Sequence, residues 1–567
     1  MSNPLPSTPL AAPTDIHPNL NPQAANRLIR PIGAYALQGI TFHGDRLLGL
    51  DALRGYLLSI DPATDDAAII NSQYIEAYTD ATGLSLWENT LWITREQEVL
   101  RCPLDSPLPV VFSRLPYTAE GVAVWGQTVY VTCQRAGAIL VFDSESGRRI
   151  TKFPAPGIGA ENIAVWGEYL WVIDRTEQTV YCLDRATGEV LISALTPFGS
   201  PTGIAVRPQT TPTLGTLWIA YADEEPYIRD NPNAEDPFEL TFRDRTLIAP
   251  LHFHHHADAG YVRSNRYLIE MAYVEEISPL DAVALHNVEW RIALPTNSDR
   301  QTLKQVEPVG MPFTEEHVNG QRIAVFRFDK LNPRESHLLG WRAQIEVGGI
   351  KYQLKPGQIE TIRPLSIEEQ QRYLVDDDEL AMDNPTIQAA AQTAAGRETN
   401  LLRKVLSIRN FVYDRLSYGI RPHIDTPDIV LERGIGSCGE YVGLLLALCR
   451  LNGIACRTVG RYKCPPQADR LGLTLEPDFN HVWIEFLVPG YGWLPMESNV
   501  DDVIDGGPYP TRFFMGLPWY HVEMGKEVPF EKIKTAPGDP EVTLGDLALN
   551  HVRFKILEAL PLTALSQ

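Results

Sequence analysis

The first 230 residues repeat a pattern of alternating hydrophobic and polar positions, which is typical of short β-strands. Similar phrases, among them GVAVWGQTVYVT and NIAVWGEYLWVID, recur at steps of 44, 38, 41 and 41 residues. In the first four units an Asp stands 22 positions after the start of the phrase. The phrases begin at Gly39, Gly83, Gly121, Asn162 and Gly203, and the Asp residues are Asp61, Asp105, Asp143 and Asp184.

Units of about 40–45 residues with several strands each predict an all-β propeller, which we expect over residues 25–245. Five units are visible, and the segments around 25–33 and 235–250 could complete a sixth blade. A β-solenoid or a sandwich is the alternative, but matched spacing at two anchors argues against it. The repeated Asp residues are expected to form turns rather than to bind a ligand.

From about Arg266 the strand-like runs continue without the 41-residue period. Asn319-Gly320 and Gly348-Gly349 have the composition of hairpin turns between such runs. We therefore expect a β-sandwich over residues 246–362.

After residue 366 the apolar residues take up helical spacing. The segment GEYVGLLLALCRL follows the turn GIGSC and ends at Asn452-Gly453, which places Cys438 at the start of a helix. The free N–H groups and the dipole of a helix start lower the pKa of a thiol, and the thiolate is the nucleophile. The same N–H groups could stabilise an oxyanion. Cysteines are also common core residues, which is the expectation for Cys449, Cys456 and Cys464.

About 40 residues later, the alternation in NHVWIEF predicts a strand that carries His481. A turn at Pro489–Gly492 leads into a second strand near Glu497. A nucleophilic Cys needs a base, and the base needs a third group that fixes its tautomer. A plain four-residue loop would turn Glu497 away from His481. We therefore expect a five-residue connection or a bulge near 488–492, with a carboxylate within hydrogen-bond reach of the imidazole.

The motif GIGSC at a helix start, followed by GIACR, HVWIE and PGYGW with an acid behind it, resembles the transglutaminase-like core of papain-type cysteine enzymes. The resemblance implies an α+β papain-like catalytic domain, expected over residues 363–535, without a metal cofactor. It implies Cys438 as the nucleophile and His481 as the general base. The family has an Asp sixteen positions after the His, where this chain has Glu497. Glu497 is the expected third residue, with Asn499 as the alternative.

Composition and charge mainly exclude classes of partner. The 567 residues include 49 Lys and Arg against 71 Asp and Glu, a net charge of −22 that disfavours a nucleic acid partner. The start has no signal-peptide pattern, and no apolar stretch is long enough to cross a membrane. Seven scattered cysteines fit a reducing compartment, so we expect a cytoplasmic protein without membrane contact. Residues 1–24 are expected as a disordered arm and 536–567 as a tail that packs on the catalytic core.

The predicted function is thiol-dependent acyl transfer on protein or peptide carboxamides through a thioester at Cys438. Water is favoured over an amine as the acceptor, and the propeller would bind the substrate or a protein partner. The alternative is an inert scaffold in which the propeller and the sandwich bind a protein partner. A metal hydrolase is a third possibility, because the run HFHHHADAG places His252, His254 and His256 on one face of a strand, but this spacing is weak support.

Overall fold

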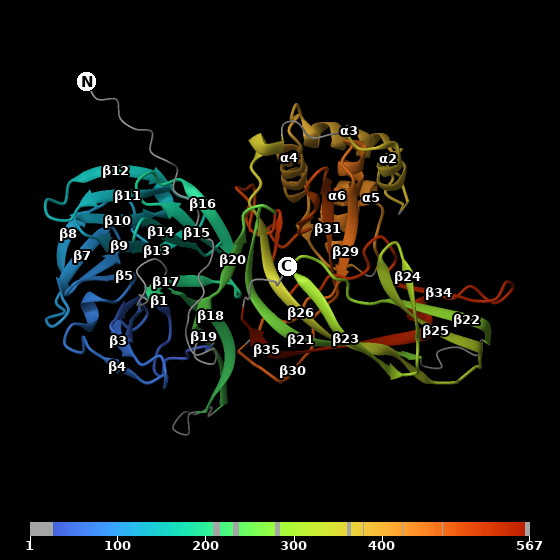
Figure 1. Cartoon of the computed structure of the whole chain (residues 1–567), viewed down its shortest axis with the longest axis horizontal. Helices are drawn as coiled ribbons and strands as arrows, with labels where there is room; N and C mark the ends of the chain where they lie inside the picture. The colour runs from blue at the N-terminus through green and yellow to red at the C-terminus, as the bar shows by residue number, and fades with distance from the viewer. Residues whose placement is uncertain are drawn as a thin grey trace. The chain divides into compact units, whose positions relative to one another are not determined.

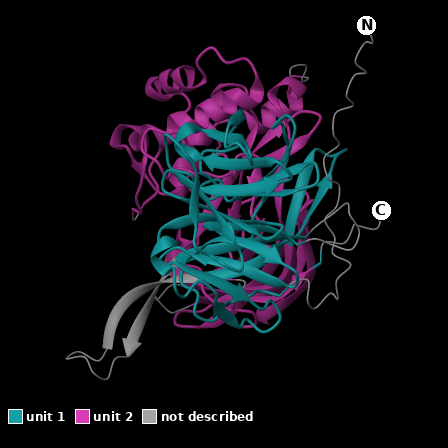
Figure 2. Cartoon of the chain, turned by 90° about the vertical axis from the view of Figure 1, so that its left-hand side faces the viewer, with its two compact units in different colours: residues 1–265, 561–567 teal, residues 266–560 magenta. Residues whose placement is uncertain are grey.

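A computed structural model describes residues 27–207, 216–230, 238–277, 284–359, 364–377, 379–421, 423–467 and 469–561. The expected arm at residues 1–24 lies outside this part of the chain. The chain divides into two compact units, residues 1–265 with 561–567 and residues 266–560 (Figure 2). Among the helices of the described residues, none has the length and apolar content needed to cross a membrane.

Each repeat of the first unit folds into its own small antiparallel sheet (Figure 1). Four sheets have four strands and the fifth has three. Their strands are β1 (Leu37–His43), β2 (Arg46–Asp51), β3 (Tyr56–Ile60) and β4 (Ala67–Ile69); β5 (Ala81–Trp87), β6 (Thr90–Arg95), β7 (Glu98–Pro103) and β8 (Val110–Arg114); β9 (Gly121–Trp125), β10 (Thr128–Cys133), β11 (Ala138–Asp143) and β12 (Arg149–Pro154); β13 (Ala160–Trp166), β14 (Tyr169–Asp174), β15 (Thr179–Asp184) and β16 (Val190–Leu195); β17 (Pro201–Arg207), β18 (Thr216–Asp230) and β19 (Phe238–Leu251). Short 3₁₀ turns lie at Ile75–Ala77 and Gln134–Ala136.

The first strands of these sheets contact one another in a closed series, β1 to β5, β9, β13, β17 and back to β1. Their approach is close, because a Cβ atom on Gly121 would lie 2.7 Å from the Cα atom of Asn162. The Nδ2 atom of Asn162 lies 2.5 Å from the carbonyl oxygen of Gln38 in β1 and 2.9 Å from that of Thr82 in β5. It also lies 2.8 Å from the carbonyl oxygen of Thr202 in β17. The five repeat starts therefore occupy equivalent strands, as predicted.

The segments around 25–33 and 235–250 extend the fifth sheet instead of building a sixth one. Strand β19 pairs with β18 along its length, and Ile29 forms an isolated antiparallel bridge with Ile248. The idea of a sixth blade is therefore wrong for the described residues. Ile29, which precedes the first repeat, and β19, which follows the last one, are both hydrogen-bonded into the fifth sheet.

Three of the repeated Asp residues close turns, as expected. Each accepts a hydrogen bond from a backbone N–H two or three positions later, namely Asp61 from Ala63 (2.8 Å), Asp143 from Ser146 (2.7 Å) and Asp184 from Thr187 (2.8 Å).

The second unit contains two larger sheets, built from both the expected sandwich and the C-terminal segment. One has the strand order β23-β26-β21-β35-β30, with β33 beside β26, and the other has the order β24-β25-β22-β34. The strands are β21 (Tyr261–Ile277), β22 (Leu285–Ala293), β23 (Gln301–Gly310), β24 (Thr314–Val318), β25 (Gln321–Leu331), β26 (His337–Tyr352), β30 (Thr474–Leu475), β33 (Gly516–Leu517), β34 (Glu531–Lys534) and β35 (Ala548–Leu560).

One detail of this region differs from the expectation. The turn at Asn319-Gly320 joins β24 to β25 with φ values of 51° and 80°, whereas Gly348-Gly349 lies inside β26 and forms no hairpin. Within the expected tail, β35 pairs with β21 from Arg266–Leu560 to Ile277–Ala548, and it also pairs with Thr474 and Leu475 of β30 in the expected catalytic domain. The sandwich region and the expected catalytic domain thus share backbone hydrogen bonds, which explains why they form one compact unit.

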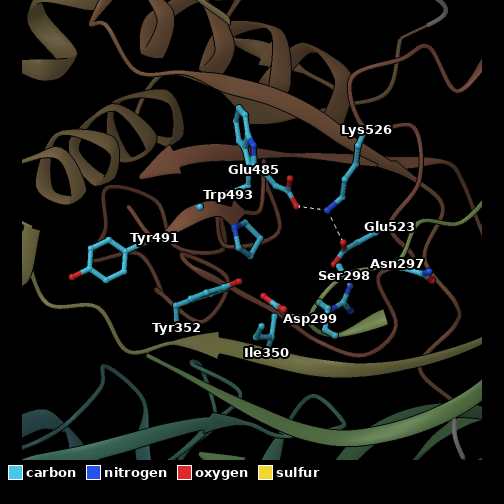
Figure 3. Close-up of a pocket in the computed structure, with 13 residues that line it drawn as sticks. Asn297, Ser298, Asp299, Ile350, Tyr352, Glu485, Tyr491, Trp493, Glu523 and Lys526 are labelled. Atoms are coloured by element: carbon cyan, nitrogen blue, oxygen red, sulfur yellow. Dashed lines mark hydrogen bonds and ion pairs between the residues drawn. The ribbon is translucent and has the colours of Figure 1, made fainter. Parts of the chain in front are cut away.

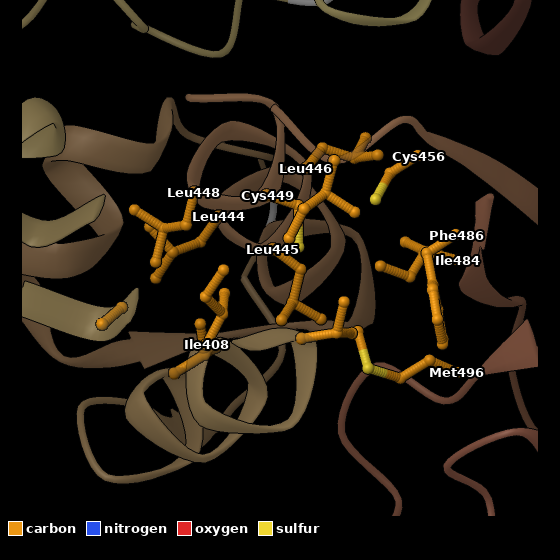
Figure 4. Packing of buried hydrophobic residues seen from close by; sticks show 14 of the residues in the cluster. Ile408, Leu444, Leu445, Leu446, Leu448, Cys449, Cys456, Ile484, Phe486 and Met496 are labelled. Atoms are coloured by element: carbon orange, nitrogen blue, oxygen red, sulfur yellow. The ribbon is translucent and has the colours of Figure 1, made fainter. Parts of the chain in front are cut away.

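The segment expected to be the catalytic domain, residues 363–535 and called the catalytic segment below, packs helices against a three-stranded sheet of order β29-β31-β32. The helix α6 lies in the centre of its apolar core, with Leu444, Leu445 and Leu448 fully buried (Figure 4). The elements are η3 (Pro356–Ile359), α2 (Ile367–Tyr373), α3 (Pro385–Ala395), α4 (Leu401–Tyr413), β27 (Ser417–Tyr418), α5 (Pro427–Arg433), β28 (Ile435–Gly436), α6 (Cys438–Leu451), β29 (Cys456–Arg461), β31 (His481–Val488), β32 (Gly492–Met496) and α7 (Leu544–Leu547).

Candidate active site

Cys438 is the first residue of α6, as the sequence predicts. Helix α5 ends at Gly434, which has a φ of 73°, and Gly436 then pairs with Tyr418 in the parallel bridge β27–β28. The N–H of the N-cap residue Ser437 donates to Glu440 Oε2 at 2.7 Å. These contacts fix the turn that delivers the thiol to the helix start, where backbone N–H groups have no partner within the helix.

His481 is the first residue of β31, and Glu497 follows directly after β32. The hairpin pairs Val488 with Gly492 and Ile484 with Met496, so Trp483 lies opposite Glu497 in register. This register puts Glu497 on the same side of the hairpin as His481, as the predicted reach between carboxylate and imidazole requires. The predicted five-residue connection or bulge is wrong, because the loop has three residues, 489–491, and the pairing is regular.

The buried His481 and Glu497 side chains are in direct contact. His481 Nε2 lies 2.7 Å from Glu497 Oε1, which leaves the other ring nitrogen for Cys438, whose pKa His481 lowers. The three side chains are 7%, 1% and 0% exposed for Cys438, His481 and Glu497. Asn499 does not take the third position, because its Oδ1 atom accepts a hydrogen bond from Ser498 Oγ at 2.8 Å.

A fourth residue, His521, completes the site and was not predicted from the sequence. Its Nε2 atom lies 2.5 Å from Glu497 Oε1, and its side chain is fully buried. The backbone N–H of Ser498 donates to the other carboxylate oxygen, Oε2, at 2.9 Å. His521 stands in a single β-bridge with Lys463, 24 residues after Glu497, and no motif or periodicity surrounds it.

The electrostatics favour a thiolate paired with an imidazolium. Burial acts to raise the pKa of Cys438, but the hydrogen bond and charge of His481 and the N–H of Val482 outweigh it and lower this pKa. Burial acts to lower the pKa of His481, but the charge of Glu497 and hydrogen bonds to Cys438 and Glu497 raise it overall.

Glu497 and its second imidazole partner, His521, have opposite pKa shifts. Burial favours the neutral form of Glu497, but the charge of His481 and the hydrogen bonds from His481 and His521 bring its pKa well below the usual value. Burial lowers the pKa of His521 to about 3, despite the opposing contacts with Glu497, so His521 is neutral near pH 7.

The other six cysteines are buried and free, and none of them stands at a helix start. Burial raises the pKa of Cys102, Cys133, Cys182, Cys456 and Cys464. Cys438 is therefore the one cysteine with a lowered pKa among the described residues.

The histidine run offers no comparable cluster. In β20 (Phe253–His256) the ring centres of His254 and His256 are 4.2 Å apart, and Arg263 Nε donates to His256 Nε2 at 3.0 Å. The positive guanidinium of Arg263 would repel a metal cation bound at His256. His252, His254 and His256 do not form a group that could hold one ion in the part of the chain that the structure describes.

His481, Glu497 and His521 are the residues whose donor atoms lie close enough together to suggest a metal site. However, both imidazoles point at the same carboxylate oxygen, at 2.7 Å and 2.5 Å. These are distances of direct hydrogen bonds, and the oxygen occupies the position that an ion would need. The three residues therefore fit a hydrogen-bonded relay better than a metal site.

A hollow of about 460 Å³ borders the sheet but is not lined by Cys438, His481 or Glu497 (Figure 3). Within it, Lys526 Nζ lies 2.8 Å from Glu485 and 2.7 Å from Glu523. Arg300 and Arg457 also form ion pairs with Glu523 and Glu485, so the carboxylates of this hollow are engaged in ion pairs and it is not the candidate reactive centre.

The chain was compared with curated proteins, solved structures and family models. A curated protein matching the sequence was not found. A structure from Cytophaga hutchinsonii, provisionally named a cysteine protease, is similar at 15% identity and a TM-score of 0.36, over 52% of this chain and 100% of the other. The glutaminyl cyclase of Myxococcus xanthus is similar at 13% identity and a TM-score of 0.28, over 40% of this chain and 95% of the other. At these scores the two structural likenesses add no weight.

The family comparison is specific to the catalytic segment. Residues 387–498 match the family model of the transglutaminase-like superfamily. The matched segment begins in α3 and ends just after the acid that contacts His481. The chain therefore contains a transglutaminase-like domain over residues 387–498, and this domain includes Cys438, His481 and Glu497.

Proposed function

We propose that this protein is a cysteine enzyme that transfers acyl groups from protein or peptide carboxamides. The Cys438 thiolate attacks the carboxamide carbon, and His481 gives its proton to the departing nitrogen. The C–N bond breaks as the C–S bond forms, which releases ammonia or an amine and leaves a thioester. Water then attacks the thioester, His481 accepts its proton, and a carboxylic acid and free thiol result.

The supporting residues have separate roles in this proposal. Glu497 keeps His481 in the tautomer with a proton on Nε2 and stabilises the imidazolium. The first N–H groups of α6 stand where the oxyanion of the tetrahedral intermediate would develop. No metal or other cofactor takes part in these steps.

The observation that supports the proposal most strongly is the buried pair of His481 and Glu497, 2.7 Å apart, together with the pKa of Cys438 that His481 lowers. These three residues fill the roles of nucleophile, base and orienting acid with buried groups. We prefer water as the acceptor of the acyl group. Cross-linking needs a shielded path for an amine, and the sequence does not reveal one. An amine acceptor would make the enzyme a transglutaminase.

For the first unit we propose a five-bladed β-propeller that presents the substrate or binds a protein partner. The five separate sheets and the closed series of first strands support this interpretation. A cytoplasmic location also stays a proposal, supported by the seven free cysteines.

The alternative proposal is an inert scaffold whose first unit and sandwich strands bind a protein. It predicts that the thiol of Cys438 has no special reactivity. The lowered pKa of Cys438 and the fully bonded Glu497 favour an enzyme.

The test is to trap the thioester on the whole protein. Peptides with Gln or Asn carboxamides are added, the mixture is quenched in acid, and the mass of the intact protein is measured. We expect an acyl adduct on Cys438 and release of ammonia, both lost in Cys438→Ala. Added alkylamine that becomes incorporated would identify an amine as the acceptor. An adduct in neither protein, or an equal adduct in both, would contradict the proposal.

A further inference from the structure

A second, smaller hollow of about 270 Å³ adjoins the candidate nucleophile. Its lining includes Gly439, which follows Cys438 in α6, and Val482, which follows His481 in β31. Cys438 and His481 themselves are not in this lining, so a group bound in the hollow would contact the residues that directly follow the nucleophile and the base in the chain.

Two glycines on one face of α6 keep this space open. Gly439 and Gly443 are four positions apart, so they lie one above the other on the helix. A Cβ atom on Gly443 would touch only the Cγ atom of Pro427, at 3.8 Å, which is ordinary contact. The backbone therefore does not require glycine at 443, and a side chain there would project into the hollow.

The rest of the wall is largely apolar. Val442, Leu446, Val482 and Pro427 line it, and Ile424 stands beside Gly439 with 74% of its surface exposed. An exposed isoleucine at a concave site gains from being covered by another apolar group.

The acidic residues of the lining do not create a strong anionic site. The Asp425 carboxylate is ion-paired with Arg433, which also bonds Glu440 at 2.6 Å. Glu379 contributes the other carboxylate and is exposed to solvent. Ligand sites for whole small molecules measure about 300–1,000 Å³, so this hollow has the size for one side chain.

We propose that this hollow is a subsite for an apolar side chain of the carboxamide substrate. The substrate class would then be peptides or proteins with an aliphatic or aromatic residue next to the reacting group. This inference rests on the proposed function, because it requires Cys438 to be the reacting thiol.

The probe for this subsite is a set of alkylating agents used on the whole protein. Iodoacetamide, N-hexyl iodoacetamide and N-(6-aminohexyl) iodoacetamide are compared by their labelling rates at Cys438, each divided by its rate with free cysteine. Peptide mass spectrometry separates Cys438 from the other six thiols. We expect the hexyl reagent to label Cys438 about tenfold faster than iodoacetamide, the gain typical of small apolar groups in a fitted pocket.

Filling the hollow should remove this preference. In Gly443→Leu we expect the hexyl advantage to disappear while the rate with iodoacetamide stays the same, and in Gly443→Ala we expect a partial loss. The control Ala389→Leu also introduces a leucine, on an exposed position of α3, and should keep the advantage. If Gly443→Leu does not fold, Gly443→Ala alone tests whether filling the hollow reduces the hexyl advantage.

Three results would overturn the subsite: no hexyl advantage in the natural protein, an undiminished advantage in both Gly443 variants, or a preference for the aminohexyl reagent. A preference for the aminohexyl reagent would mean that the carboxylates of Glu379 and Asp425 recognise the substrate. These outcomes are distinct from failure of the proposed function, in which iodoacetamide itself would not react faster with Cys438 than with the other cysteines.

Discussion

The charge state of Glu497 depends on the three donors that surround it. His481, His521 and the N–H of Ser498 all bond a carboxylate that is 0% exposed. A buried carboxylate without such partners would be neutral, because losing its hydration is costly. The negative charge that results is what keeps His481 protonated beside the thiolate.

Changing Glu497 to Gln tests this charge without changing the shape of the side chain. The amide NH₂ group can donate to His481 Nε2, which would place the remaining proton on the nitrogen facing Cys438, the wrong tautomer for a base. We expect turnover to fall by about 10²–10⁴-fold. The pKa of Cys438 should also rise, since the imidazolium is its main favourable partner. Labelling kinetics across pH measure this shift, and full activity in the variant would transfer the third role to another residue.

His521 is expected to act by positioning Glu497, whose side chain has three rotatable bonds. His521→Phe keeps a ring among Trp483, Phe513 and Tyr520 but removes the donor. We expect kcat to fall about tenfold with little change in KM, the size of one charge-assisted hydrogen bond of about 1.5 kcal/mol. His521→Gln, which can still donate, should recover most of the rate and of the pH profile. If His521 had only a structural role, His521→Phe and His521→Gln would lose the same amount of stability, and the pH profile of activity would not shift in either.

The residues of the site differ in how far the sequence could predict them. Cys438 follows a Gly-rich turn and begins an apolar helix, and His481 begins an alternating strand, so local patterns identify both. Glu497 follows from the hairpin register. His521 has no local signal, because a single bridge to Lys463 and packing around it decide its position.

At the scale of elements, the β31–β32 hairpin sets the distance between base and acid. Gly490 and Gly492 have φ values of 94° and 104°, which side chains rarely adopt. These two glycines allow a three-residue loop and pair Val488 with Gly492. The sequence predicts the register because one face must carry both His481 and Glu497, but backbone angles, which the spacing does not reveal, decide the loop length.

Gly492→Ala tests the cost of this loop. A Cβ at this position meets nothing within 4 Å, so the effect should come from the backbone angle alone. We expect the free energy of unfolding to fall by about 1–2 kcal/mol. Gly357→Ala is the control, since it also meets nothing and has no positive φ. Equal stabilities in urea unfolding would contradict this, and slower labelling of Cys438 would indicate a changed register.

At the scale of the whole molecule, the sequence predicts the strands of the first-unit repeats but not the strand pairing in the large sheets of the second unit. The 41-residue period places the first-unit strands correctly, because each sheet is built from residues close in sequence. The pairing of β21 with β35 joins residues nearly 300 positions apart, such as Arg266 and Leu560. No local pattern encodes such a partner, so the sequence did not predict that residues Ala548–Leu560 form this strand.

Asn162 is the residue on which the closed series of first strands depends most directly. Asn162→Asp keeps the shape but replaces the donor by an acceptor facing three carbonyl oxygens. We expect the first unit to lose about 1–3 kcal/mol of stability, with faster hydrogen exchange in β1, β5 and β17. Asn89→Asp, on an exposed position of the same unit, is the control. Unchanged exchange would show that the amide does not hold the strands together.

The central claim is that Cys438 is an activated thiol, and the pH dependence of alkylation at each cysteine of the native protein tests it most directly. A lowered pKa means that the thiolate persists below the ordinary thiol range and is lost only as the pH falls through the lower value. We predict that iodoacetamide labels Cys438 far faster than the other six cysteines near pH 7, with a midpoint below about 8.5. The rate should collapse in His481→Ala at the same pH. Equal rates for all seven thiols, or a midpoint for Cys438 at or above the ordinary value, would contradict the account.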